Sequence, residues 1–68
     1  MKLTADTITD QQIDELIRTG LVGDAGRAAL GEAIDRDWEG KRPPTEHERQ
    51  LARALCAEIL NARAEVKS

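Results

Sequence analysis

The stretch that decides the fold runs from Thr45 to Val66 and reads TEHERQLARALCAEILNARAEV. Its apolar side chains recur at spacings of three and four residues, which is the pattern of an amphipathic α-helix. They are Leu51, Leu55, Ile59, Ala62 and Val66. Two prolines directly before Thr45 prevent an earlier start, and Thr45 with Glu48 has the spacing of a capping box. We therefore expect a helix over residues 45–65 whose apolar stripe lies in the core.

Two shorter helices are predicted before this one. Thr9 and Gln12 have the same capping-box spacing, and Gly20 is placed to end the helix that they begin. Asp24 is a favourable N-cap for the next helix, which we expect to continue to Glu39. The predicted ranges are 9–19 and 24–39.

Two glycines lie inside the second predicted helix. Gly26 and Gly31 each cost roughly 1 kcal/mol relative to alanine in a helix interior. We interpret them as positions where a neighbouring element approaches too closely to leave room for a side chain.

The fold class follows from these three helices. With 68 residues the chain has room for one domain, and no segment shows the alternation of a strand. We predict an all-α protein, a small three-helix bundle, in which residues 1–8 are a flexible N-terminal arm and residues 9–68 are a single helical domain. Its expected core consists of Ile13, Leu16, Ile17, Leu21, Leu30, Ile34, Trp38, Leu51, Leu55 and Ile59.

Charge is distributed unevenly along the chain. Ten Lys and Arg against thirteen Asp and Glu give a net charge of −3, which argues against nucleic acid as the partner. Residues 1–39 carry nine acidic and four basic groups, a net −5, and residues 40–68 carry four acidic and six basic groups, a net +2. On the second predicted helix, Glu32, Asp35 and Glu39 form an acidic ridge. This ridge is either a binding face for a basic partner or an ordinary solvated surface.

Composition also bears on the cellular compartment. A single cysteine excludes an intramolecular disulfide, and no stretch approaches the ~20 apolar residues that cross a membrane. The N-terminus lacks the apolar region of a signal peptide. We expect a cytoplasmic protein without a membrane interaction.

No residue pattern predicts catalysis, a cofactor site or a metal site. His47 has no second or third ligand at a suitable spacing, and Cys56 has no neighbouring base that would activate it. We read His47 as a solvated side chain and Cys56 as a small buried hydrophobic residue. The chain is therefore predicted not to be an enzyme, with no catalytic residues, cofactor or metal.

A small helix-turn-helix DNA-binding regulator is the alternative function. The first two predicted helices and the turn between them have suitable lengths, and the regulator would need Arg27, Arg42 and Arg49 on one surface. The second helix, however, begins with Asp24 and offers only Arg27 for base contacts in its first turns. A small basic patch for another anionic partner is a related possibility, and its members are Lys41, Arg42, Arg49 and Arg53.

Two segments carry a resemblance to other proteins. They are the opening TITDQQI at residues 7–13 and the run ERQLARALCAEILNAR at residues 48–63. Together they resemble a class of very short, uncharacterised proteins carried by phages, plasmids and integrated elements of proteobacteria. Small acidic helical proteins of such elements often bind a host protein, and anti-CRISPR proteins are one such group. The resemblance implies a mobile-element accessory protein and carries over no functional residue.

These observations predict a non-enzymatic protein-binding module. The most specific form of this hypothesis is an anti-defence protein that covers the nucleic-acid groove of a host component, in the manner of an anti-CRISPR protein. Its first candidate contacts are Glu32, Asp35 and Glu39. We also expect a homodimer through the last helix, because an alanine-rich core leaves residues such as Leu60 and Val66 without an obvious cover.

Overall fold

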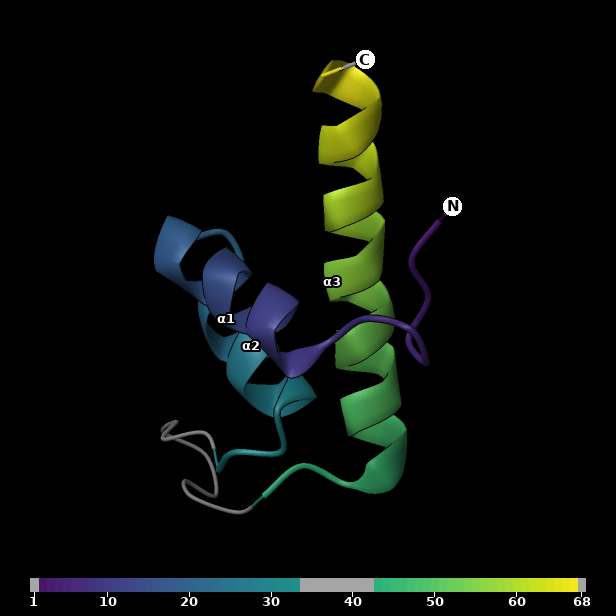
Figure 1. Cartoon of the computed structure of the whole chain (residues 1–68). Coiled ribbons are helices and arrows are strands. Elements are labelled where there is room, and N and C mark those ends of the chain that lie inside the picture. The colour runs from purple at the N-terminus through teal and green to yellow at the C-terminus, as the bar shows by residue number, and fades with distance from the viewer. Residues whose placement is uncertain (1, 34–42, 68) are drawn as a thin grey trace.

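The computed structural model describes residues 2–33 and 43–67, and in these ranges the chain is an all-α, three-helix protein. Its helices are α1 (Asp10–Thr19), α2 (Gly23–Ala29) and α3 (Glu46–Lys67). Figure 1 shows α1 and α2 together on one side of α3, whose C-terminal part extends past both of them. The described residues contain no strand, so the predicted fold class is confirmed.

The first helix begins and ends as the sequence predicts. Gln12 donates its backbone N–H to the Thr9 hydroxyl at 3.2 Å, and the Gln12 side chain accepts the Thr9 N–H at 2.8 Å. At the other end Gly20 has a φ of +80° and donates its N–H to the Ile17 carbonyl. This left-handed conformation favours glycine and stops the helix.

The long helix α3 also starts where it was predicted. Thr45 accepts the N–H of Glu48 at 3.2 Å, and the Glu48 carboxylate accepts the N–H of Thr45 at 2.8 Å. This reciprocal capping box gives an acceptor to two backbone N–H groups that would otherwise have none at the N-terminus of the helix.

The prediction for the second helix was wrong at both ends. The helix α2 begins at Gly23 with Val22 as its N-cap, so Asp24 lies in the first turn and does not cap it. It ends at Ala29, because Gly31 adopts a φ of +84° and closes a Schellman motif. In that motif the N–H of Gly31 reaches the carbonyl of Ala28 at 3.0 Å, and the N–H of the next residue reaches the carbonyl of residue 27 at 2.9 Å. The rest of the predicted range, residues 34–39, lies outside the described residues.

The core lies where α1, α2 and the middle of α3 meet, and half of its buried side chains are small. Its buried apolar residues are Ile8, Ile13, Leu16, Val22, Ala28, Ala29, Cys56 and Ala57. Ile13 and Leu16 were predicted here, and the expectation that Cys56 is a small buried residue is confirmed. The predicted core members Ile17, Leu30 and Ile59 are partly buried against this cluster.

Three predicted core residues are exposed instead. Leu21 and Leu51 are each 59% exposed and Leu55 is 44% exposed. For Leu51 and Leu55 the reason is that α3 turns Cys56 and Ala57 toward the body, so these leucines lie on another face of the same helix. Leu21 lies in the short connection between α1 and α2. Two further predicted members, Ile34 and Trp38, lie outside the described residues.

Gly26 is a point of close approach, as predicted. A Cβ atom at this position would collide with Cγ1 of Ile17 and would lie 3.2 Å from Cγ2 of Val22. The absence of a side chain therefore lets α2 lie directly against α1.

The segment before α1 is tied to the distant end of the chain. Leu3 and Asn61 exchange two hydrogen bonds, each 2.9 Å long, between the Leu3 backbone and the Asn61 amide. Figure 1 shows this segment crossing α3, and Ile8 enters the core at its end. The N-terminal arm expected over residues 1–8 thus has defined contacts from Leu3 onward.

Arg53 joins three separate segments of the fold. Its Nε donates to the Ala5 carbonyl at 3.1 Å, and its guanidinium also donates to the carbonyl oxygens of Ile8 and Ala29. An ion pair of 3.1 Å with Asp10 completes the set. The Arg53 side chain is only 14% exposed, so its bonds to the three carbonyls are largely shielded from water, whereas the Asp10 side chain is 76% exposed.

Replacing Arg53 by methionine should destabilise the fold strongly. The substitution keeps much of the apolar length of the side chain but leaves the carbonyls of Ala5, Ile8 and Ala29 without this donor. We expect a loss of about 2–4 kcal/mol in the free energy of unfolding, measured by urea denaturation. The matched control is Arg18→Met on the exposed side of α1, which should change stability by less than about 0.5 kcal/mol. Equal midpoints for the two variants would contradict this role of Arg53.

Two glycine substitutions in the same helix should have opposite effects. Gly26→Ala pushes against Ile17 and should cost about 1–3 kcal/mol. Gly23→Ala meets nothing within 4 Å and should leave stability unchanged or raise it by up to about 1 kcal/mol. Thermal unfolding followed by circular dichroism measures both, and a stabilised Gly26→Ala variant would show that α1 and α2 are not in close contact.

Candidate functional site

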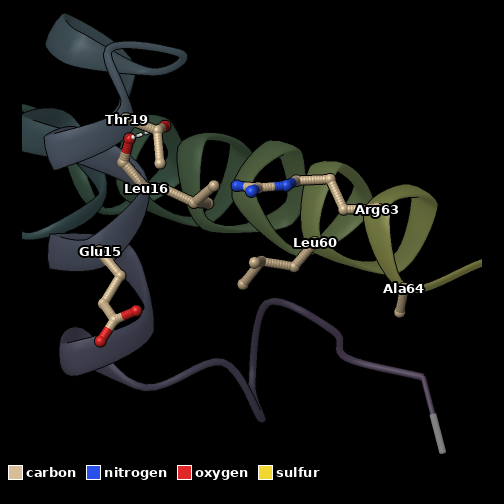
Figure 2. A pocket seen from close by; sticks show the side chains of 6 residues that line it. All are labelled: Glu15, Leu16, Thr19, Leu60, Arg63 and Ala64. Carbon is tan, nitrogen blue, oxygen red and sulfur yellow. Dashed lines mark hydrogen bonds between the residues drawn. The ribbon is translucent and has the colours of Figure 1, made fainter. Parts of the chain in front are cut away.

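A groove runs beside Leu60 between α1, α3 and the N-terminal segment. It consists of two adjoining hollows of about 330 and 500 Å³, which share Glu15 and Leu60. The first is lined by Glu15, Leu16, Thr19, Leu60, Arg63 and Ala64 (Figure 2), and the second by Leu3, Thr9, Gln11, Gln12, Glu15 and Leu60. The groove exists because α3 continues past the end of α1, which leaves Leu60 only partly covered.

The groove has few groups that could carry out chemistry. In its first hollow the charged side chains are Glu15 on α1 and Arg63 on α3, and both are exposed. Thr19 uses its hydroxyl to donate to the Leu16 carbonyl, so this hydroxyl already has an acceptor (Figure 2). An apolar floor with one acidic and one basic side chain suits the contact of a protein side chain better than acid–base catalysis.

Among the residues that the structure describes, the acidic, His and Cys side chains outside the groove do not gather into one site. No group of three or more His, Cys, Asp and Glu in residues 2–33 and 43–67 is arranged to hold a metal ion. His47 is exposed in the first turn of α3. No helix in the part of the chain that the structure describes is long and apolar enough to cross a membrane.

Cys56 is buried in the core. Burial raises the pKa of the Cys56 thiol above its ordinary value of 9.0, and the nearby charge of Arg53 opposes this effect only in part. The thiol therefore stays protonated at neutral pH and is poorly placed to act as a nucleophile.

The predicted acidic contacts are only partly placed by the structure. Glu32 is exposed just after the end of α2, whereas Asp35 and Glu39 lie outside the described residues. Because α2 ends at Ala29, Glu32 is not on the helix that was expected to carry the acidic ridge. Its exposure leaves it available for a partner.

The two described members of the predicted basic patch turn inward. Arg53 is held by backbone carbonyls, and Arg49 lies over Gly31, with its Nε 3.2 Å from the position that a Cβ atom would occupy there. This Nε is buried and has no hydrogen-bond partner among the described residues. Lys41 and Arg42 lie outside those residues.

The α2 helix is poorly suited to reading DNA bases. It has seven residues, and its charged side chains are Asp24 and Arg27, whereas a helix that enters the major groove uses several hydrogen-bond donors.

An apolar stripe is exposed along the outer side of α3. We call it the outer stripe, and its exposed members are Leu51, Leu55, Ala62 and Val66. Leu51 is 59% exposed and Val66 is 86% exposed. On the helix these positions lie opposite Cys56 and Ala57, so the body of the protein cannot cover them. The sequence analysis had placed Leu51 and Leu55 in the core, which was wrong, and had expected Val66 to lie without a cover, which is confirmed.

Comparisons with models of protein families, with curated proteins and with solved structures find no match to this chain.

The buried thiol predicts a pH effect on stability. Because the native state raises the pKa of Cys56, its contribution to stability is fully present below the thiol pKa of the unfolded chain and is lost as pH rises through the folded pKa. We expect the melting temperature to fall above about pH 9 more steeply for the natural chain than for Cys56→Ala. Parallel pH curves, or rapid labelling of the native thiol by a disulfide reagent at pH 7.5, would contradict this prediction.

Proposed function

We propose that this chain is a non-enzymatic module that works by binding another protein. The observation that carries the proposal is the outer stripe of α3, which exposes Leu51, Leu55, Ala62 and Val66 on one side of one helix. Single exposed leucines are common on soluble proteins. Four apolar side chains in line, spread over about 22 Å of helix, form the kind of continuous patch that marks an interaction surface.

The rest of the described surface supports binding in preference to catalysis. The groove beside Leu60 offers an apolar floor with Glu15 and Arg63 at its sides, which suits the anchoring of a side chain from a partner. Its few polar groups do not form a nucleophile with a base or a pair of acids.

Charge favours a partner with a basic surface. The net charge of −3 over the whole chain opposes general nucleic-acid binding and assists the approach of a basic protein. In the most specific form of the proposal, this partner is a host defence component whose nucleic-acid site is basic, and Glu32, Asp35 and Glu39 are its predicted contacts. A cytoplasmic setting, where thiols stay reduced, suits the single buried cysteine.

A matched pair of leucines tests the proposal. Leu51 and Leu21 are equally exposed, but only Leu51 belongs to the outer stripe. We expect Leu51→Ser combined with Leu55→Ser to abolish capture of a protein partner by the immobilised chain, whereas Leu21→Ser should leave it intact. All variants should keep the helical spectrum of the natural chain, because exposed leucines contribute little to its stability.

Two outcomes would count against the proposal. One is protein capture that is unaffected by both stripe substitutions. The other is a DNA mobility shift that survives moderate salt and is lost in Arg27→Ala, which would favour the helix-turn-helix regulator.

A further inference from the structure

We infer that the groove beside Leu60 binds an amphipathic helical segment of another protein. This segment carries two large apolar side chains, with basic residues along one edge and acidic residues along the other. The inference rests on the proposed protein-binding function and names the kind of segment that the groove fits.

The floor of the groove has room for two apolar side chains. Leu60 lines both hollows, Leu16 lines the first and Leu3 lines the second. Figure 2 shows Leu16 and Leu60 extending toward one another from α1 and α3. Because the two hollows share Leu60, they adjoin. Two side chains four residues apart on one helix can therefore enter them together.

The openness of the groove suits a protein segment better than a small molecule. Most of its lining residues are exposed, and these are Thr9, Gln11, Glu15, Thr19, Arg63 and Ala64. A small-molecule site buries most of the surface of its ligand. This groove can cover only one side of what it binds, which is how an amphipathic helix lies in a groove.

The described walls of the groove offer no backbone edge to an extended peptide. Two of them are the helices α1 and α3, whose backbone groups bond within each helix. The third is the segment before α1, where both the N–H and the carbonyl of Leu3 are bonded to the Asn61 amide. An extended peptide would leave its own backbone groups without partners on this side, whereas a helix bonds its backbone internally.

The two helical walls carry opposite charges. Glu15 on α1 lines both hollows, and Arg63 on α3 extends toward α1 beside the Leu60 side chain (Figure 2). Neither Glu15 nor Arg63 forms an ion pair within residues 2–33 and 43–67. A bound helix neutralises both charges when its edge toward α1 is basic and its edge toward α3 is acidic.

A nuclear magnetic resonance titration of the full chain tests this occupant. The probe is a capped helical peptide with two Leu four residues apart, Lys along one edge and Glu along the other. We expect it to shift the signals of Leu60 and Thr19 with a dissociation constant on the order of 0.1–1 mM, because the contact area is small. The same peptide with Ser in place of both Leu should bind more weakly by on the order of tenfold. No shift at about 2 mM probe, or equal binding of the Ser peptide, would overturn the inference.

Two exposed alanines of α3 provide matched variants. Ala64 lines the first hollow, whereas Ala62 belongs to the outer stripe on the opposite side of the helix. Ala64→Gln places a longer side chain in the hollow and should weaken binding of the probe by on the order of tenfold. Ala62→Gln should leave this binding unchanged, and both variants keep a good helix former. Equal effects of the two substitutions would overturn the assignment to the groove.

A charge substitution tests the two edges of the bound helix. Arg63→Glu makes both helical walls acidic, so this variant should prefer a probe with Lys along both edges. The natural chain should prefer the probe with one Lys edge and one Glu edge. Each preference should be about twofold to fivefold in the dissociation constant. The same order of preference in both proteins would overturn the assigned charges.

The groove and the outer stripe can be tested separately. A natural chain that captures a protein through Leu51 and Leu55 but does not bind the probe would overturn this inference alone. A chain with neither property would overturn the proposed function as well.

Discussion

The fold depends on the guanidinium group of Arg53. It lies in the middle of α3 and binds the carbonyls of Ala5 and Ile8 before α1, the carboxylate of Asp10 at the start of α1, and the carbonyl of Ala29 at the end of α2. Backbone carbonyls just before a helix or in its last turn have no hydrogen-bond partner within that helix. Burying one of them without a donor costs about 1–3 kcal/mol. A single side chain with five donors satisfies several of them at once. The N-terminal segment, α1 and α2 are thereby fixed to one point on α3.

This polar junction compensates for a core in which half of the buried side chains are small. Gly26 lets α1 and α2 come together, and Ala29 lies in the same buried cluster as Cys56 and Ala57 of α3. Small side chains allow close approach but bury little apolar area, so each contact adds modest stability. The same choice leaves Leu51 and Leu55 exposed on the outer side of α3. The composition of the core and the exposed stripe are two consequences of one packing arrangement.

The sequence predicted the features that depend on neighbouring residues. Both capping boxes and the stop at Gly20 were correct, because a cap is formed by side chains and backbone within four residues. Gly31 is a point of close approach, as predicted, since Arg49 lies over it, but it ends the helix and was wrongly placed in the helix interior. The orientation of α3 was also wrong, because periodicity shows that an apolar face exists and does not show what covers it. Arg53 could not be distinguished from Arg49 or Arg63, since its partners come from segments more than 20 residues away.

The exposed leucines connect the stability of this small chain to its binding. A chain of about this size buries only roughly 60% of the surface that it exposes when unfolded, so its stability margin is narrow. A partner that binds only the folded state adds RT ln(1 + [L]/Kd), or about 1.4 kcal/mol when its concentration is ten times the dissociation constant. This gain is comparable in size to the stability lost when a core Ile is shortened to Val. Leu51 and Leu55 are exposed and stabilise the free chain little. If a partner covers the stripe as we propose, the stability of the fold will depend on the concentration of that partner.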